Sequence, residues 1–204
     1  GMSVEYYLPS NVENLRMPDF TSVPSRPTLW GNDLDNIIIA PKGWASTLDG
    51  GAGADTLVGS TSGDKYYIDN PGDRIIEDVY SPRVGRDAVF SSISYTLEYY
   101  LDDLTLTGTS AISGTGNLSA NILNGSSNSA ANVLTGGDGS DEYILGAGDS
   151  AVEYAGEGND TVTISTGVTG TYSLASYANI ENIKLINLYD NSGEYYSNLT
   201  GNDL

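Results

Sequence analysis

Short apolar segments alternate with loops rich in Gly, Asn and Asp along most of the chain. Segments of two or three β-prone residues bounded by turn residues predict short strands joined by tight turns. No stretch has the apolar period of about 3.6 residues that marks an amphipathic helix. The pattern therefore predicts an all-β fold. Its clearest strand segments are Thr47-Leu48, Thr56-Leu57, Tyr66-Tyr67-Ile68, Val133-Leu134 and Tyr143-Ile144.

The polar residues that precede these segments recur with a period close to nine. Two nine-residue pieces complete one coil of a flattened solenoid, with apolar side chains stacked inside and turns aligned along two edges. We therefore predict a right-handed parallel β-roll, or β-helix. Residues 18 apart share an edge, which places Asp55 with Asp73 and Ser46 with Asp64. The period shows in two runs: Ser46, Asp55, Asp64 and Asp73, then Asn132 and Asp141.

A nine-residue pattern, G-G-x-G-x-D-x-U-x with U a large apolar residue, occurs three times. Residues 50–58 and 136–144 fit every fixed position, with Tyr143 as the apolar residue of the second, and residues 155–163 differ only by Ala155 at the first glycine. Glycines allow positive φ and let the loop turn its carbonyl oxygens inward. The closing Asp adds a carboxylate, and Ca²⁺ prefers six to eight oxygen ligands. Three matches favour a repeated cation-binding loop over three ordinary turns.

These loops resemble the RTX, or haemolysin-type calcium-binding, repeats of secreted bacterial proteins. Residues 63–73 and 91–109 also resemble the spacers that link such repeats. The resemblance implies Ca²⁺ ligation by backbone carbonyls at the second and fourth loop positions and by the carboxylate at the sixth. In this chain the implied ligands are Gly51, Gly53 and Asp55; Gly137, Gly139 and Asp141; and Gly156, Gly158 and Asp160. Asp64 and Asp73 are the expected partners in the first unit, and Asp149 is the counterpart of Asp73 in the second.

The chain also repeats itself at long range. Residues 64–69 match residues 141–146, Asp73 to Glu77 matches Asp149 to Glu153, and Arg86 to Val89 matches Asn159 to Val162. A third, partial copy opens the chain. We therefore predict a partial repeat or N-terminal cap over residues 1–30, one repeat unit over 31–113, and a second over 114–204 that ends in the start of a further repeat.

Charge adds to the interpretation of the loops. The chain has 27 acidic and 8 basic residues and a formal net charge of −19. Nucleic acid and anionic membranes need clustered Lys and Arg, so neither is an expected partner. Acidity by itself also serves solubility. Here many aspartates lie in glycine loops, where unpaired carboxylates repel one another, and this favours bound cations.

The residue types that are missing exclude other chemistry. The chain has no Cys and no His. Disulfide staples, the usual zinc sites and Ser-His-Asp or Cys-His catalysis are thereby excluded, so bound metal is the expected staple. Asp102 and Asp103 point to opposite faces of a strand and do not form a glycosidase pair. We expect no enzymatic activity within this chain.

Location is inferred mainly from the resemblance. No stretch approaches the ~18 apolar residues of a membrane span, and no cleavable leader is visible at the N-terminus. RTX proteins leave the cell by a one-step type I route with an uncleaved C-terminal signal. The resemblance thus implies a secreted, extracellular or cell-surface location. It also implies further repeats or an effector domain of the same polypeptide as partners.

Some loops depart from the pattern. Residues 41–46 have neither glycine at the pattern positions nor the closing Asp, while residues 114–121 and 124–132 end in Asn. We expect hydrogen-bonded Asn stacks in the last two loops. We then expect on the order of two to five calcium ions in the chain and not one ion for each loop.

Two functions remain after these arguments. The first is a calcium-binding structural module whose folding is coupled to extracellular Ca²⁺. The alternative is an adhesion module that binds polysaccharide on a flat face, with calcium as scaffold. Its support is the 15 tyrosines, several of them in pairs whose alternation directs one ring outward. Packing of the rings explains the pairs equally well. Trp30 and Trp44 are expected to cap the first coils, or to belong to such a face.

Overall fold

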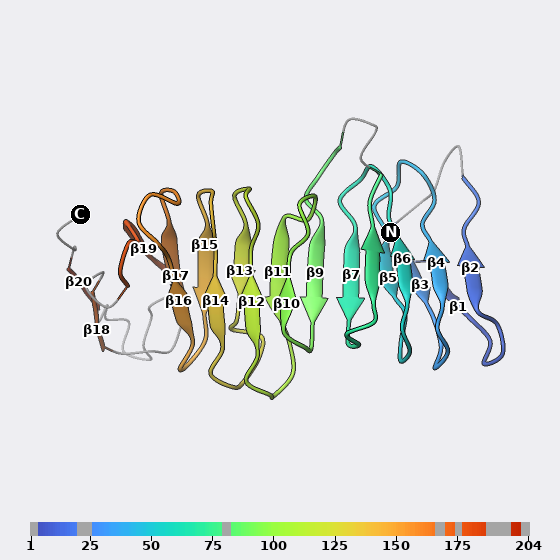
Figure 1. Ribbon diagram of the computed structural model, residues 1–204, viewed down its shortest axis with the longest axis horizontal. Coiled ribbons are helices and arrows are strands. Elements are labelled where there is room, and N and C mark those ends of the chain that lie inside the picture. The colour runs from blue at the N-terminus through green and yellow to red at the C-terminus, as the bar shows by residue number, and fades with distance from the viewer. Residues whose placement is uncertain are drawn as a thin grey trace. The chain divides into compact units, whose positions relative to one another are not determined.

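The computed structural model describes residues 4–19, 26–78, 83–165, 170–173, 177–186 and 197–200. Within these ranges the chain forms strands, turns and loops and no helix, so no helix long enough to cross a membrane occurs there. The described strand pairs are parallel, and successive coils stack as a β-solenoid (Figure 1). The predicted all-β roll is confirmed.

The chain divides into two compact units, residues 1–93 and 94–204. The boundaries predicted at 30/31 and 113/114 follow the phase of the sequence repeat. The compact units are defined by contacts in space, so those boundaries remain predictions.

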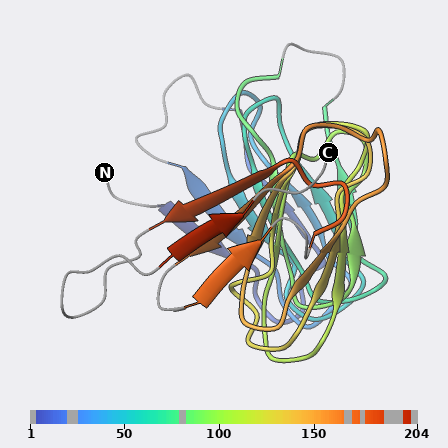
Figure 2. The ribbon, with the colours of Figure 1, turned by 90° about the vertical axis from the view of Figure 1, so that its left-hand side faces the viewer.

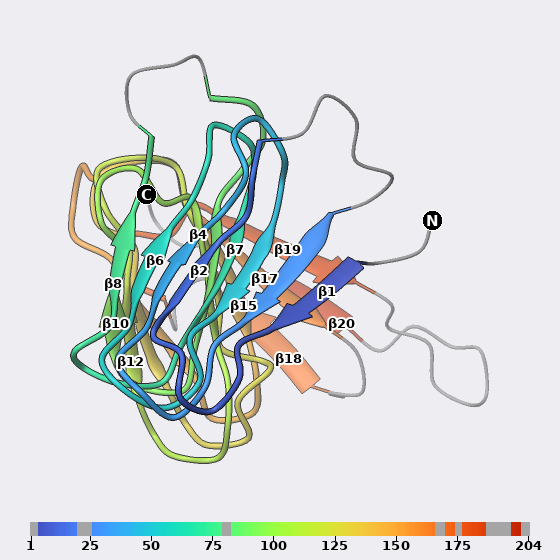
Figure 3. The same cartoon turned by 90° about the vertical axis from the view of Figure 1, so that its right-hand side faces the viewer.

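Unit 1 is built from two parallel sheets that alternate along the chain. Each coil contributes one strand to each sheet, as Figure 3 shows from the N-terminal side. The first sheet contains β1 (Val4–Tyr7), β3 (Pro27–Trp30), β5 (Thr47–Asp49), β7 (Lys65–Ile68) and β9 (Ala88–Ser91). The second contains β2 (Asn14–Arg16), β4 (Ile37–Ile39), β6 (Thr56–Val58) and β8 (Arg74–Ile76).

Unit 2 repeats this construction, and its C-terminal strands are orange to red in Figure 2. One sheet contains β11 (Asp103–Leu106), β13 (Ile122–Asn124), β15 (Glu142–Leu145), β17 (Thr161–Ser165) and β19 (Asn182–Ile186). The other contains β10 (Tyr95–Thr96), β12 (Ser113–Thr115), β14 (Val133–Thr135) and β16 (Ser150–Val152). A separate parallel pair is formed by β18 (Gly170–Ser173) and β20 (Ser197–Thr200).

Columns of identical inward positions form the core of each unit. Strand register aligns the middle residues of successive strands, and alternation directs their side chains inward. Burying each such aliphatic side chain stabilises the fold by about 1.5–3 kcal/mol. In unit 1 the column Leu29, Leu48, Tyr66 and Val89 is fully buried. In unit 2 the corresponding column is Leu104, Leu123, Tyr143 and Val162.

Side-chain acceptors join the coils along both edges of unit 1. The Asp55 N–H donates to Oδ1 of Asp73 at 2.9 Å. On the other edge, the Ser46 N–H donates to Oδ1 of Asp64 at 2.5 Å, and the Asp64 N–H donates to Oδ1 of Asp87 at 2.7 Å. Each closing side chain thus satisfies a backbone amide of the preceding coil. The predicted sharing of edges, Asp55 with Asp73 and Ser46 with Asp64, is confirmed.

The same ladder runs through unit 2. The Asn121 N–H donates to Oδ1 of Asp141 at 2.7 Å, and the Asp141 N–H donates to Oδ1 of Asp160 at 2.8 Å. In the two loops where Asn stacks were expected, Nδ2 of Asn117 and of Asn128 each donate to two backbone carbonyl oxygens of the preceding coil. Buried polar groups at the turns are thereby paired, as a stable interior requires.

The tyrosine pairs follow the predicted alternation on β7 but not on β1, where Tyr6 and Tyr7 are both exposed and the prediction is wrong. Tyr66 is buried and Tyr67 is 38% exposed, as expected on β7. Tyr99 and Tyr100 are both exposed because they lie in a turn, so the prediction is wrong for this pair. The pair at 195–196 lies outside the described residues.

Candidate cation-binding sites

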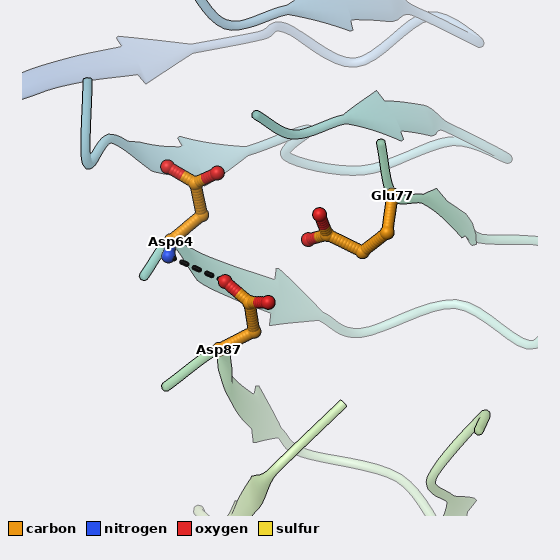
Figure 4. Close-up of side chains that lie close together, drawn as sticks. All are labelled: Asp64, Glu77 and Asp87. Atoms are coloured by element: carbon orange, nitrogen blue, oxygen red, sulfur yellow. Dashed lines mark hydrogen bonds between the residues drawn. The ribbon is translucent and has the colours of Figure 1, made fainter. Parts of the chain in front are cut away.

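Two clusters of three acidic side chains lie at turns of the solenoid, and all members are buried except Glu77, which is half-buried. One is Asp64, Glu77 and Asp87 in unit 1 (Figure 4), and the other is Asp141, Glu153 and Asp160 in unit 2. In each cluster, one oxygen from each carboxylate lies within 4.8 Å of the others. We call them cluster 1 and cluster 2. Their members correspond one to one in the long-range sequence repeat.

Strand geometry brings the three carboxylates of cluster 1 together. Asp64 and Asp87 directly precede the paired strands β7 and β9, so they are neighbours in the edge ladder. Glu77 follows β8 and reaches back toward them, as Figure 4 shows. The hydroxyl of Tyr66, which points inward from β7, donates a hydrogen bond to Oε1 of Glu77. In cluster 2, Tyr143 holds Glu153 in the same way.

A glycine leaves room for each cluster. A Cβ atom on Gly136 would lie 2.2 Å from Oδ2 of Asp141 and 2.4 Å from both Oε1 of Glu153 and the Tyr143 hydroxyl. Gly59 has the same relation to cluster 1, where a Cβ would lie 1.7 Å from the Tyr66 hydroxyl. Any side chain at either position would occupy the space in which the polar atoms converge. Gly136 is the first glycine of the nine-residue pattern, which gives that position a steric role.

Cluster 2 contains oxygens that lack a partner. Asp141 and Glu153 are only 2% and 5% exposed, and Oδ2 of Asp141 and Oε2 of Glu153 have no hydrogen bond. Oε2 of Glu77 in cluster 1 is also buried and unpartnered. Leaving a buried acceptor unsatisfied costs about 1–3 kcal/mol, and more if it is charged. Such atoms are suited to bind a cation, which supplies both the missing partner and the missing charge.

Burial makes these carboxyl groups weak acids. Desolvation raises the pKa of Glu77 and of Glu153 to about 8, and repulsion from the neighbouring aspartates adds to the effect. Burial likewise raises the pKa of Asp64 to about 7 and that of Asp141 to about 6. Without a cation, each cluster therefore retains protons near neutral pH. A divalent cation would displace them, since metal ligands must be deprotonated.

The two clusters differ in local charge. In unit 1, Arg83 forms an ion pair with Asp87, which compensates part of the negative charge of cluster 1. Among the described residues, no Lys or Arg side chain contacts cluster 2. Cluster 2 is therefore the stronger candidate for a cation.

We predict that the stability of the cation-free protein falls as pH rises. The pKa of Glu77 and of Glu153 is about 8 in the folded state, against about 4.3 in an unfolded chain. The folded state thus holds protons that the unfolded state has released. The resulting stabilisation is fully present below about pH 4.3 and is lost as pH rises through about 8. Thermal unfolding in metal-free buffers from pH 5 to 9 measures the trend, and a melting temperature that rises over this range would contradict it.

The structure brings some of the sequence-predicted residues together and separates others. Asp141 and Asp160 lie together in cluster 2, but Asp64 lies in cluster 1, on the edge opposite Asp55 and Asp73. Asp149 lies on the edge opposite Asp141, and N–H groups occupy both of its oxygens. N–H groups also occupy both oxygens of Asp73.

Five of the six predicted loop glycines have the positive φ that the pattern implies, and Gly158 does not. Four of them have positive φ and pack against carbonyl oxygens of the preceding coil. Gly156 also has positive φ, and Gly158 lies directly against the Gly139 carbonyl. The four are Gly51 and Gly53, against Asn32 and Leu34, and Gly137 and Gly139, against Asn117 and Ser119.

Sequence reasoning missed Glu77, Asp87 and Glu153 as site residues, because none occupies the acidic position of a nine-residue match. The signal lay in the long-range repeat, which aligns Glu77 with Glu153 and Asp87 with Asp160. An acidic residue that recurs outside the loop pattern in both units is a candidate for the same role in both.

No protein-family model, curated protein or solved structure matches this chain. The resemblance to RTX repeats therefore depends on the loop pattern in the sequence.

Proposed function

We propose that this chain is a calcium-binding structural module whose folded state is stabilised by cations in buried carboxylate clusters. The observation that carries the proposal is the pair of unpartnered oxygens in cluster 2, on Asp141 and Glu153, beside the buried Asp160. The recurrence of the same arrangement in cluster 1 supports a role common to both units.

Ligand chemistry favours Ca²⁺ among the common cations. Carboxylate oxygens are hard ligands, and Ca²⁺ accepts six to eight oxygens in irregular geometry, whereas Mg²⁺ demands a near-ideal octahedron. A chain without Cys or His offers none of the ligands that zinc and copper prefer. Three carboxylates with a divalent ion leave little net charge in the buried site.

The glycine loop of unit 1 is a further candidate. Oδ2 of Asp55 is buried without a partner, close to Gly50, where a Cβ would lie 1.9 Å away. Burial raises the pKa of Asp55 to about 6. With the two clusters, this position gives three candidate cation sites. That number lies within the range expected from the loop sequences.

Calcium would act on the folding equilibrium. An ion that binds only the folded state stabilises it by about 2.7 kcal/mol when its concentration is 100 times Kd. Millimolar extracellular calcium would occupy most sites that have a Kd near 10⁻⁴ M. The same sites would be empty at the calcium level of the cytosol. The proposal thus favours a secreted or cell-surface location, where the module supports further repeats or an effector domain.

A calcium titration of metal-stripped protein tests the proposal. We expect the melting temperature, followed by far-UV circular dichroism, to rise by several degrees between micromolar and millimolar Ca²⁺. Calorimetry is expected to show two or three ions per chain. Mg²⁺ at the same concentration controls for divalent charge, and NaCl of matched ionic strength controls for screening. A melting temperature that does not respond to Ca²⁺, or responds equally to Mg²⁺, would count against calcium as the ligand.

A further inference from the structure

A row of aromatic side chains crosses the outer face of the first sheet of unit 1. Strand register aligns one residue from each strand in this row. The residue before each of the last four members is fully buried, so alternation directs the row outward. The row is Tyr7, Trp30, Asp49, Tyr67 and Phe90.

Two stacked pairs occupy the ends of this row. The rings of Tyr7 and Trp30 are stacked with centroids 5.9 Å apart and an interplanar angle of 5°. Those of Tyr67 and Phe90 are stacked at 5.0 Å and 15°. Asp49, on the strand between the pairs, interrupts the stack. One face of the Trp30 ring is covered by Tyr7, and one face of the Tyr67 ring is covered by Phe90. The second face of each ring therefore turns toward the position of Asp49.

The interruption has the dimensions of a cation site. Two strand spacings separate β3 from β7, which places the two rings ~10 Å apart. A group midway between them would lie ~5 Å from each centroid, inside the ~6 Å range of cation–π attraction. A flat aromatic ligand needs only ~3.5 Å on each side and would leave the gap partly empty. Asp49 has a short side chain, so we expect its carboxylate at the base of the gap, with Oδ1 accepting the Gly51 N–H.

The charges around the gap favour a positive ligand. Asp49 supplies a carboxyl group on the strand between the two rings, and its Oδ1 accepts the Gly51 N–H. The faces of the flanking rings are also electron-rich. On the same strand as Tyr67, Nζ of Lys65 lies 5.7 Å from the centroid of the Phe90 ring. One ammonium group of this sheet is therefore already held against an aromatic ring.

We propose that Trp30, Asp49 and Tyr67 form a binding site for an organic ammonium cation, with the rings as walls and the carboxylate as base. Aromatic walls are poor ligands for Ca²⁺, whereas they attract quaternary and protonated amines. The site shares no residue with cluster 1 or cluster 2, but it adjoins the candidate loop of Gly50 and Asp55, because Oδ1 of Asp49 accepts the Gly51 N–H.

Choline and its uncharged isostere 3,3-dimethyl-1-butanol test the role of charge. The two have the same shape, and only choline carries the positive charge. Fluorescence of the W44F variant reports on Trp30 alone, because the chain has two tryptophans. We expect saturable quenching by millimolar choline and at least ~10-fold weaker binding of the isostere. Saturation-transfer NMR on the unmodified chain repeats the comparison without any substitution.

Two variants test the assigned residues. Asp49→Asn keeps the Oδ1 acceptor that receives the Gly51 N–H and removes only the charge. Tyr67→Leu removes one wall. Each is expected to weaken choline binding by ~5-fold or more. Tyr99→Leu, at an exposed tyrosine outside the row, is the matched control and should change nothing.

Several results would overturn the proposal: equal binding of choline and the isostere, no loss in D49N, or no binding at all. Binding of a neutral oligosaccharide such as maltotriose, without binding of choline, would instead assign the face to polysaccharide. The measurements are made with and without Ca²⁺. If the calcium proposal is wrong, the melting temperature does not respond to Ca²⁺, but choline still binds. The two proposals therefore fail separately.

Discussion

Replacing Glu153 with Gln is expected to stabilise the calcium-free protein and to remove the response of cluster 2 to calcium. Glu153 is almost fully buried and its pKa is raised to about 8 by burial, so without a cation it must hold a proton at neutral pH. Gln needs none and keeps an oxygen that accepts from the Tyr143 hydroxyl. The free energy of unfolding without calcium should rise by about 3–4 kcal/mol at pH 7, because the unfolded carboxyl, with a pKa of about 4.3, has released its proton at this pH.

In saturating calcium the advantage of the variant is lost. The variant forgoes a gain of about 3 kcal/mol from the lost site, so its stability becomes similar to that of the parent chain. Urea unfolding, followed by circular dichroism with and without chelator, measures both values. Glu98→Gln removes the same charge from an exposed position of unit 2 and should leave both unchanged. Destabilisation of E153Q in chelator as well as in calcium would show that the ionised Glu153 serves the fold directly.

Replacing Gly136 with Ala is expected to have the largest effect on cluster 2. The added Cβ would lie 2.2 Å from Oδ2 of Asp141 and 2.4 Å from Oε1 of Glu153, so both carboxylates must move. Overpacking of this kind costs about 3 kcal/mol in the absence of calcium. With the ligands displaced, the further gain of about 3 kcal/mol from calcium should also be lost.

Gly108→Ala is the matched control for this substitution. Gly108 has φ of +88° but open space around its Cα, so alanine adds backbone strain without a clash. Its cost should be about 1 kcal/mol, with the calcium response intact. Calorimetric titration and urea unfolding of both variants separate strain from loss of the site. Calcium binding by G136A with unchanged affinity would remove Gly136 and its neighbours from the candidate site.

The sequence predicted the coils because the signals that define them are local. Alternation within three-residue segments places Leu48, Leu57 and Tyr66 inside, and the nine-residue spacing places Asp55 and Asp73 on one edge. Insertions that lengthen a coil beyond 18 residues lie in the loops and leave the strands in register. The register step is 18 residues from Leu48 to Tyr66 but 23 from Tyr66 to Val89, and the strands on either side stay in phase.

Which edge a loop occupies could not be predicted from the loop itself. Residues 50–55 lead from β5 to β6, out of the five-stranded sheet of unit 1. Residues 136–141 lead from β14 to β15, into the five-stranded sheet of unit 2. One nine-residue piece is half a coil, so the same pattern suits either half. The edge depends on packing across the whole coil.

Glu77 and Glu153 were hidden for a related reason. Each follows the last strand of a coil, and its carboxylate reaches the aspartates only because an inward tyrosine from the facing sheet holds it there. That contact spans 11 residues in unit 1 and 10 in unit 2. It depends on the depth of the core between two sheets, which no short sequence window contains.

The edge ladder gives the solenoid a direction. In each step the side chain of a later coil accepts the amide of an earlier one, as Asp160 does for Asp141 and Asp141 does for Asn121. Ribosomal synthesis delivers the chain from its N-terminus, so an emerging coil has its amides in place before their acceptors exist. Each coil is completed only when the next ~19 residues arrive, and order should therefore trail synthesis by one full coil.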